Sequence, residues 1–152
     1  KGTLKENITV RMPDASDEEI LRVSQMSGAQ RFVDVHPMGF DMPVGERGES
    51  LSGGQKQAIS IARAFIHTAP IILLDEPTNS MDSTSEAGFI KALKEYKEGR
   101  TTIIISHKPS ILQITDRLIL IEQGKILLDG TYSDVMKRLT DKRIDKRRGV
   151  RQ

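Results

Sequence analysis

Acidic and histidine side chains follow two short apolar runs of the sequence, each with the composition of a β-strand. Asp75 and Glu76 come directly after the run 71–74, and His107 comes two residues after the run 101–105. Because chemistry in a parallel α/β sheet gathers beyond the carboxyl ends of the strands, we expect these side chains at one edge. Two adjacent carboxylates can hold a divalent cation through water and deprotonate a nucleophilic water. On this observation alone, a turn-capping Asp75 and a solvated Glu76 remain an open alternative.

A second candidate site is the run Ser52, Gly53, Gly54 and Gln55, which opens a predicted helix that ends before Pro70. Two glycines allow a ligand to approach the backbone closely. The N–H groups and the dipole at the start of a helix favour an anion, and the serine adds a hydroxyl donor. A simple capped helix start, with Ser52 as the cap, is an equally open alternative.

The strand-end residues require a particular arrangement of elements. The continuous apolar runs at 71–74 and 101–105 predict strands buried on both faces. A helix is predicted between them at about 84–97, with Ala87, Ile90, Leu93 and Tyr96 facing inward. Strand, helix and strand at this spacing predict a βαβ unit with parallel strands and a right-handed crossover.

The flanking segments have local signals of their own. The run Ser-Asp-Glu-Glu at 16–19 is a capping box that predicts a helix start. Residues 117–122 and 125–129, separated by Gln-Gly, predict a β-hairpin. A last helix is predicted at about 133–139, with Ser133 as its cap.

Composition excludes several classes of protein. The 152 residues are 37% hydrophobic and 29% charged, as in a globular domain. The absence of cysteine excludes disulfides, thiolate metal sites and cysteine nucleophiles, and no apolar run approaches the roughly 20 residues of a membrane span. The net charge is only +2, although residues 137–152 hold eight basic and two acidic side chains. We interpret this end as a solvated terminus, with attraction to anionic lipid or nucleic acid as the alternative.

Taken in order, these motifs resemble those of the nucleotide-binding domain of ABC ATPases. The run 51–55 resembles the family's signature motif, and 71–76 resembles its Walker B strand. Residues 80–82 resemble the D-loop, and His107 resembles the switch histidine. The implied fold is an incomplete α/β domain of the P-loop NTPase type, with a helical signature subdomain, the back half of a mainly parallel core sheet and a C-terminal β-hairpin.

The resemblance also implies boundaries. Residues 1–69 correspond to the helical signature subdomain and its preceding loop, and residues 70–139 to the C-terminal half of the ATPase core. Residues 140–152 form a basic tail that is predicted to be flexible.

The resemblance implies roles for the candidate residues in ATP hydrolysis with Mg²⁺. Asp75 would hold Mg²⁺ through water, Glu76 would act as general base, and His107 would contact the γ-phosphate. Asp82 would cross the interface to a second nucleotide-binding domain, in a head-to-tail dimer. The signature residues would bind the γ-phosphate of the ATP that this partner holds; they are Ser52, Gly53, Gly54 and Gln55.

Two further segments resemble those of ABC exporters. The run Val-Gly-Glu-Arg-Gly-Glu at 44–49 is similar to the exporter segment that touches the coupling helices of the transmembrane domain. The run Asn-Ser-Met-Asp at 79–82 is most like type I secretion ATPases, which export RTX proteins and large adhesins. The resemblance thus implies a protein substrate, a periplasmic adaptor and a place at the cytoplasmic face of the bacterial inner membrane.

The sequence departs from the family in one large respect. No G-x-x-x-x-G-K-[ST] phosphate loop occurs in it, and residue 1 is Lys. We therefore expect a fragment that does not hydrolyse ATP alone, whereas its parent is an ATPase. Two other functions stay open: an ABC exporter of a small molecule or lipid, and a nucleic-acid-handling ABC ATPase that uses the basic tail. The exporter-like segment at 44–49 argues against nucleic acid as a partner.

Overall fold

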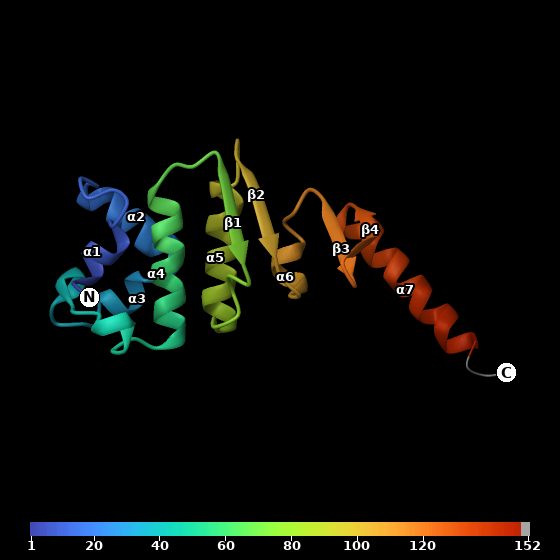
Figure 1. Ribbon diagram of the computed structural model, residues 1–152, viewed down its shortest axis with the longest axis horizontal. Coiled ribbons are helices and arrows are strands. Elements are labelled where there is room, and N and C mark those ends of the chain that lie inside the picture. The colour runs from blue at the N-terminus through green and yellow to red at the C-terminus, as the bar shows by residue number, and fades with distance from the viewer. Residues whose placement is uncertain (150–152) are drawn as a thin grey trace. The chain divides into compact units, whose positions relative to one another are not determined.

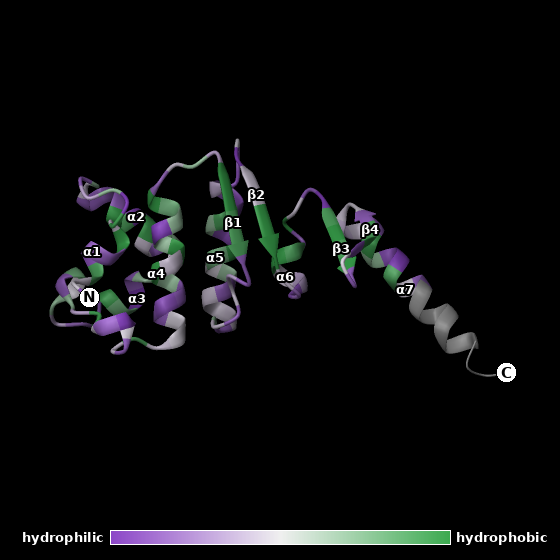
Figure 2. Cartoon of the chain, viewed as in Figure 1, coloured by the Kyte–Doolittle hydropathy of each residue, from purple (hydrophilic) through white to green (hydrophobic). Residues whose placement is uncertain are grey.

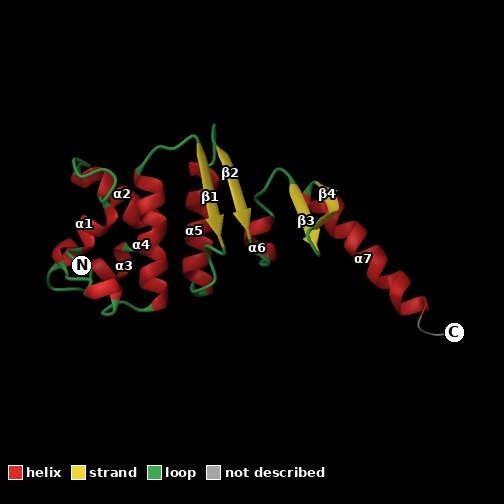
Figure 3. Cartoon of the chain, viewed as in Figure 1, coloured by secondary structure: helices red, strands yellow, loops and turns green. Residues whose placement is uncertain are grey.

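The computed structural model describes the backbone of residues 1–149 and the side chains as far as Asp141. It is an α/β structure with two compact units, Lys1–Ile105 and the part from Ser106 onward. Figures 1 and 3 show helices in both units, a pair of strands at the end of the first unit and a hairpin in the second. The predicted α/β class is confirmed.

The first unit begins with short helices that lead to the long helix α4. Their bounds are α1 Leu4–Ile8, α2 Asp17–Ser27, α3 Gln30–Val33, the 3₁₀ turns η1 Gly39–Asp41 and η2 Glu46–Gly48, and α4 Gly53–Ile66. Helix α4 lies against both α1 and α2 (Figure 1).

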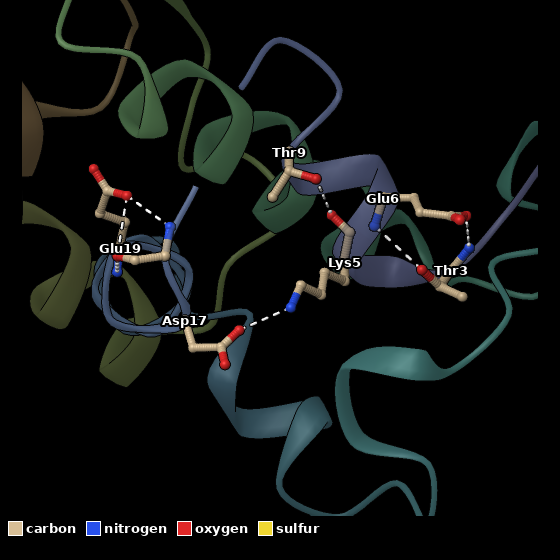
Figure 4. A network of polar contacts seen from close by, with 7 residues as sticks. Thr3, Lys5, Glu6, Thr9, Asp17 and Glu19 are labelled. Carbon is tan, nitrogen blue, oxygen red and sulfur yellow. Dashed lines mark hydrogen bonds and ion pairs between the residues drawn. The ribbon is translucent and has the colours of Figure 1, made fainter. Parts of the chain in front are cut away.

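Capping boxes set the start of α1 and of α2. The predicted box at α2 is confirmed, since Ser16 Oγ accepts from the Glu19 N–H and the Glu19 carboxylate accepts from the Ser16 N–H. Thr3 and Glu6 form the same pair at α1. Figure 4 shows both pairs and the ion pair that joins the helices, in which Lys5 Nζ lies 2.8 Å from Asp17 Oδ1. Each box satisfies N–H groups that the first helical turn leaves unpaired.

The apolar faces of these helices form one core. The apolar face of α4, formed by Ala58, Ile61, Ala62 and Phe65, is buried, and so are Ile20 and Val23 of α2. Leu4 and Ile8 of α1 are also fully buried. These side chains of α1, α2 and α4 therefore form the core of the helical part of the first unit.

Helix α5, Ser83–Tyr96, corrects one prediction. Its buried residues are Phe89, Leu93 and Tyr96, whereas Ala87 is exposed and Ile90 is half-buried. The rings of Phe89 and Tyr96 stack on Phe65, with centroid distances of 6.1 and 4.3 Å. The aromatic side chains bury the most apolar area, so their face of the helix turns inward.

Strands β1, Ile71–Asp75, and β2, Thr101–Ile105, pair in parallel as predicted. The prediction that both faces are buried is wrong. Ile72 and Leu74 are buried, but Ile71 and Leu73 are 58% and 69% exposed. On β2, Ile103 and Ile105 are 47% and 57% exposed, and Ile103 is in register with Leu73. We call these four side chains the open face; Figure 2 shows how apolar both strands are. Burial on both faces requires cover on both faces, and the first unit covers one.

The second unit contains the predicted hairpin. Strands β3, Leu118–Glu122, and β4, Lys125–Gly130, pair antiparallel around Gln123 and Gly124. Both turn residues have positive φ, of 49° and 74°, as a tight two-residue hairpin turn requires. Short helix α6, Pro109–Leu112, precedes the hairpin.

Helix α7, Tyr132–Gly149, ends the described chain and differs from its prediction at both ends. The N-terminal cap is Thr131, whose Oγ1 accepts from the Asp134 N–H, so the prediction of Ser133 as the cap is wrong. The helix continues past Leu139 through the basic segment, and residues 150–152 of the predicted tail lie outside the described residues. Among the residues described, no helix has both the length and the apolarity needed to cross a membrane.

Candidate functional site

The two strand-end carboxylates lie where β1 leaves the sheet. Asp75 is the last residue of β1, in register with Ile105 of β2. The next residue, Glu76, donates its backbone N–H to the Ile105 carbonyl at 2.9 Å. The parallel pairing of the two strands thus fixes the backbone at the start of the loop that carries Glu76, as the predicted βαβ unit requires.

Glu76 has a backbone conformation that is rare outside glycine. Its φ is 44°, in the left-handed region. Residues other than glycine persist there only when the surrounding structure holds them, and such positions are concentrated at functional sites. Hydrogen bonds on both backbone groups stabilise this conformation. The Glu76 N–H donates to the Ile105 carbonyl of β2, and the Glu76 carbonyl accepts hydrogen bonds, including one from the Asn79 N–H at 3.2 Å.

The signature run forms the first turn of α4. Ser52 is the N-cap, its Oγ accepting from the Gln55 N–H at 3.2 Å, while Gln55 Oε1 accepts from the Ser52 N–H at 2.8 Å. The capped helix start that the sequence left open is therefore present. It does not exclude an anion, because the Ser52 hydroxyl still has a proton to donate and Gly53 and Gly54 present N–H groups in the same turn.

The signature turn lies next to the loop after β1. A Cβ atom built on Gly54 would stand 3.1 Å from the backbone oxygen of Ser80. Glycine at this position therefore allows a close approach between two segments that are far apart in sequence. The structure brings together two of the sequence-predicted motifs, the signature run and the D-loop.

Sequence reasoning missed a polar contact between the same two segments. The Gln57 side chain, on α4, donates from Nε2 to the Glu76 carbonyl at 2.7 Å. Its Oε1 accepts from the Ser80 N–H at 3.0 Å. Nothing in the sequence around a single glutamine of an amphipathic helix indicates that its side chain binds the backbone of a distant loop.

Asp82 is the N-cap of α5. Its carboxylate accepts from the backbone N–H of Ser85 at 2.9 Å and from the Ser85 hydroxyl at 2.6 Å. Hydrogen bonding from the Ser85 side chain, then from its backbone, lowers the pKa of Asp82. The side chain of Asp82 is 67% exposed. The same carboxylate lies 3.8 Å from Arg31 Nη1, so within this chain it caps α5 and pairs with Arg31.

His107 lies two residues past β2, at the beginning of the second unit. Its side chain is exposed. The neighbouring turn is fixed by a hydrogen bond from the Lys108 N–H to Ser106 Oγ at 3.2 Å.

The carboxylates of Asp75 and Glu76 suit a divalent cation that keeps part of its water shell better than a metal ion held by protein ligands alone. No group of three or more His, Asp or Glu side chains within the described residues forms a possible metal site. Mg²⁺ commonly takes one or two protein carboxylates and completes its shell with water and substrate phosphates. Asp75, exposed at the sheet edge next to Glu76, fits that donor set.

The exporter-like segment lines a basic pocket of about 310 Å³ beside α4. Arg47 and Gly48 come from that segment, and Lys56 and Arg63 come from α4. Arg63 donates through Nη2 to Asn7 Oδ1 at 2.6 Å, which ties α4 to α1. Arg47 has a φ of 52°, so this segment, like the Glu76 loop, contains a left-handed residue.

Comparison with known proteins establishes the family. Residues 3–79, about half of the chain, match the family described as ABC transporter. The chain therefore belongs to the ABC transporter family.

Individual relatives are exporters. Putative multidrug export ATP-binding/permease proteins of Staphylococcus aureus strains COL and Mu50 are 42% identical over 134 residues. The match covers 88% of this chain and 23% of each relative's length. A solved structure of a bacterial Atm1-family ABC exporter with ATP bound aligns with a TM-score of 0.83 and 33% identity, covering 90% of this chain and 24% of that chain. The predicted resemblance to part of the nucleotide-binding domain of an ABC exporter is confirmed.

Proposed function

We propose that this chain supplies the signature helix and the strand-end carboxylates of an ATP-hydrolysing motor domain in an ABC exporter. The observation that carries the proposal is Glu76. It follows a parallel strand directly, adopts a left-handed conformation and is hydrogen-bonded to the neighbouring strand. The exporter relatives support the same conclusion from the sequence side.

In this proposal Glu76 is the general base of hydrolysis. It accepts a proton from a water molecule whose oxygen attacks the γ-phosphorus of ATP. The bond between that phosphorus and the β–γ bridging oxygen breaks, and the products are ADP and phosphate. Asp75 would hold Mg²⁺ through water, which would supply charge neutralisation at the phosphates, and His107 would contact the γ-phosphate.

The signature turn serves a second ATP. Its serine hydroxyl and glycine N–H groups, with the Gln55 side chain, bind the γ-phosphate of nucleotide held by a second nucleotide-binding domain. Asp82, exposed at the start of α5, reaches across the same interface. Phosphate binding at a helix N-terminus of this kind uses N–H donors and the helix dipole together.

A transmembrane domain is the second proposed partner. The pocket beside α4 is lined by the segment that resembles the exporter contact with the coupling helices. Its Arg and Lys side chains give it a basic character, which suits an acidic or carbonyl-rich helix end. This docking would place the chain at the cytoplasmic face of a bacterial inner membrane.

Two cargoes are supported by different observations. The relatives named as multidrug exporters support a small molecule. The run 79–82 supports type I protein secretion with a periplasmic adaptor. A transport assay in membrane vesicles with a fluorescent drug separates them, because ATP-dependent drug uptake supports the first and its absence favours the second.

The test of the motor uses the exporter polypeptide in which this sequence occurs, purified with its transmembrane region. Glu76→Gln is expected to lower Mg²⁺-dependent ATP hydrolysis by roughly 10²- to 10⁴-fold, the usual contribution of a general base. ATP affinity should be unchanged. Glu95→Gln, on the exposed side of α5, is the matched control and should keep full activity. Full activity in Glu76→Gln would contradict the proposal.

A further inference from the structure

The loop between β1 and α5 carries two of the proposed site residues and is held at several points. It runs from Glu76, the proposed general base, to Asp82, the cap of α5. Internal turns fold it, with hydrogen bonds from the Asn79 N–H to the Glu76 carbonyl and from the Met81 N–H to the Thr78 carbonyl. Pro77 and Thr78 at its centre are buried. The loop therefore has a defined conformation, in which the position of Glu76 depends on the groups that bind its backbone.

Gln57 binds this loop at both of its turns. Its amide donates to the Glu76 carbonyl at 2.7 Å and accepts from the Ser80 N–H at 3.0 Å. A glutamine amide has one donor end and one acceptor end, and each end here meets the complementary backbone group. A single side chain thus joins the residue proposed as base to the D-loop.

The same side chain belongs to the signature helix. Gln57 lies two residues after Gln55, and close packing of Gly54 against Ser80 brings that turn onto the loop. Any displacement of the start of α4 therefore acts on the Glu76 backbone through Gln57. The half-buried position of Gln57 shields these hydrogen bonds in part from competing water.

We infer that Gln57 is a positioning residue, which couples the signature helix to the general base and fixes the left-handed backbone of Glu76. This inference rests on the proposed function of Glu76. It assigns Gln57 no contact with ATP, and it assigns the coupling to the two backbone hydrogen bonds rather than to packing alone.

The first test is Gln57→Leu in the complete exporter polypeptide, with its transmembrane region present. The substitution removes the hydrogen bond of the Ser80 N–H to Gln57 and one of the hydrogen bonds that hold the Glu76 carbonyl. We expect kcat for ATP hydrolysis to fall roughly tenfold with little change in KM. Gln25→Leu, at an exposed position of α2, is the matched control and should leave both constants unchanged. A rise in KM with unchanged kcat would overturn the inference, since it would indicate a role in binding.

Two further variants separate positioning from packing and keep the test valid if Gln57→Leu fails to fold. Gln57→Lys keeps a donor for the Glu76 carbonyl, whereas Gln57→Glu keeps only an acceptor for the Ser80 N–H. We expect the lysine variant to retain several-fold more kcat than the glutamate variant at equal thermal stability. Equal rates in the two variants would show that the hydrogen bond to Glu76 does not matter.

The double variant Glu76→Gln, Gln57→Leu tests the role of Gln57 separately from the proposed role of Glu76 as general base. If Gln57 acts through Glu76, the second substitution adds little to the loss caused by the first. A full additional tenfold loss would overturn the inference and leave the role of Glu76 intact. Full activity of Glu76→Gln alone would instead overturn the proposed function.

Discussion

The helices of the first unit and its two-stranded sheet differ in how completely they bury their apolar side chains. Helices α1, α2 and α4 bury one apolar face each, including Leu4 and Phe65 at 0% exposure. On one face of the sheet Ile72 and Leu74 of β1 are buried and Thr102 and Ile104 of β2 are half-buried, whereas the open face is accessible. We therefore expect the helical core to supply most of the stability, whereas the strands position Asp75 and Glu76.

The largest effect on stability should come from the helical core. Phe65→Ala removes a ring that stacks on both Phe89 and Tyr96 and is fully buried. We expect a loss of about 3–5 kcal/mol in the free energy of unfolding. Denaturant unfolding followed by circular dichroism measures it, and a loss below about 1 kcal/mol would show that the helices are not the stabilising region.

Adjacent leucines on opposite faces of β1 test the comparison within one strand. Leu74→Ala, on the covered face, should cost about 2–5 kcal/mol of unfolding free energy. Leu73→Ala, on the open face, should change it by less than about 0.5 kcal/mol, because its side chain is already accessible to water. The same denaturant titration compares the two, and equal losses would contradict the difference between the faces.

The smallest effect concerns the ion pair between α1 and α2. The hydrogen bond from Lys5 lowers the pKa of Asp17, and the same contact raises the pKa of Lys5. A lowered carboxyl pKa contributes stability that is present above the ordinary value of 3.8 and is lost as the pH falls through the folded-state value.

The measurement for this pair is the midpoint of thermal unfolding against pH. Asp17→Asn should lower the midpoint slightly near neutral pH, and the difference from the unsubstituted chain should vanish in acid. Glu18→Gln, exposed in the same helical turn, controls for the helix dipole. An equal shift in both variants would assign the effect to the dipole instead of the pair.

Much of the local structure could be predicted, because its causes are local. The capping box at Ser16, the hairpin turn at Gln123 and Gly124 and the parallel βαβ unit each depend on residue types within a short window. Helix α5 could not be oriented in this way. Its two candidate apolar faces share Leu93, and the choice between them depends on contact with Phe65, which is distant in sequence.

The candidate site shows the same division. The strand-end position of Asp75 and Glu76 was predictable from the apolar runs before them. The contact of Gln57 with Glu76 was not, because it requires the packing of α4 against the loop after β1. The cap of α7 at Thr131 rather than Ser133 is a smaller example, since either hydroxyl residue could have begun the helix.

The most direct measurement of the central claim is the fate of a single ATP at the proposed site. The exporter polypeptide in which this sequence occurs is incubated with Mg²⁺ and radiolabelled ATP and separated rapidly from free nucleotide. We expect the unsubstituted protein to retain labelled ADP, whereas Glu76→Gln retains intact ATP. Recovery of ADP from the Glu76→Gln protein, at the rate of the unsubstituted protein, would contradict the claim that Glu76 is the general base.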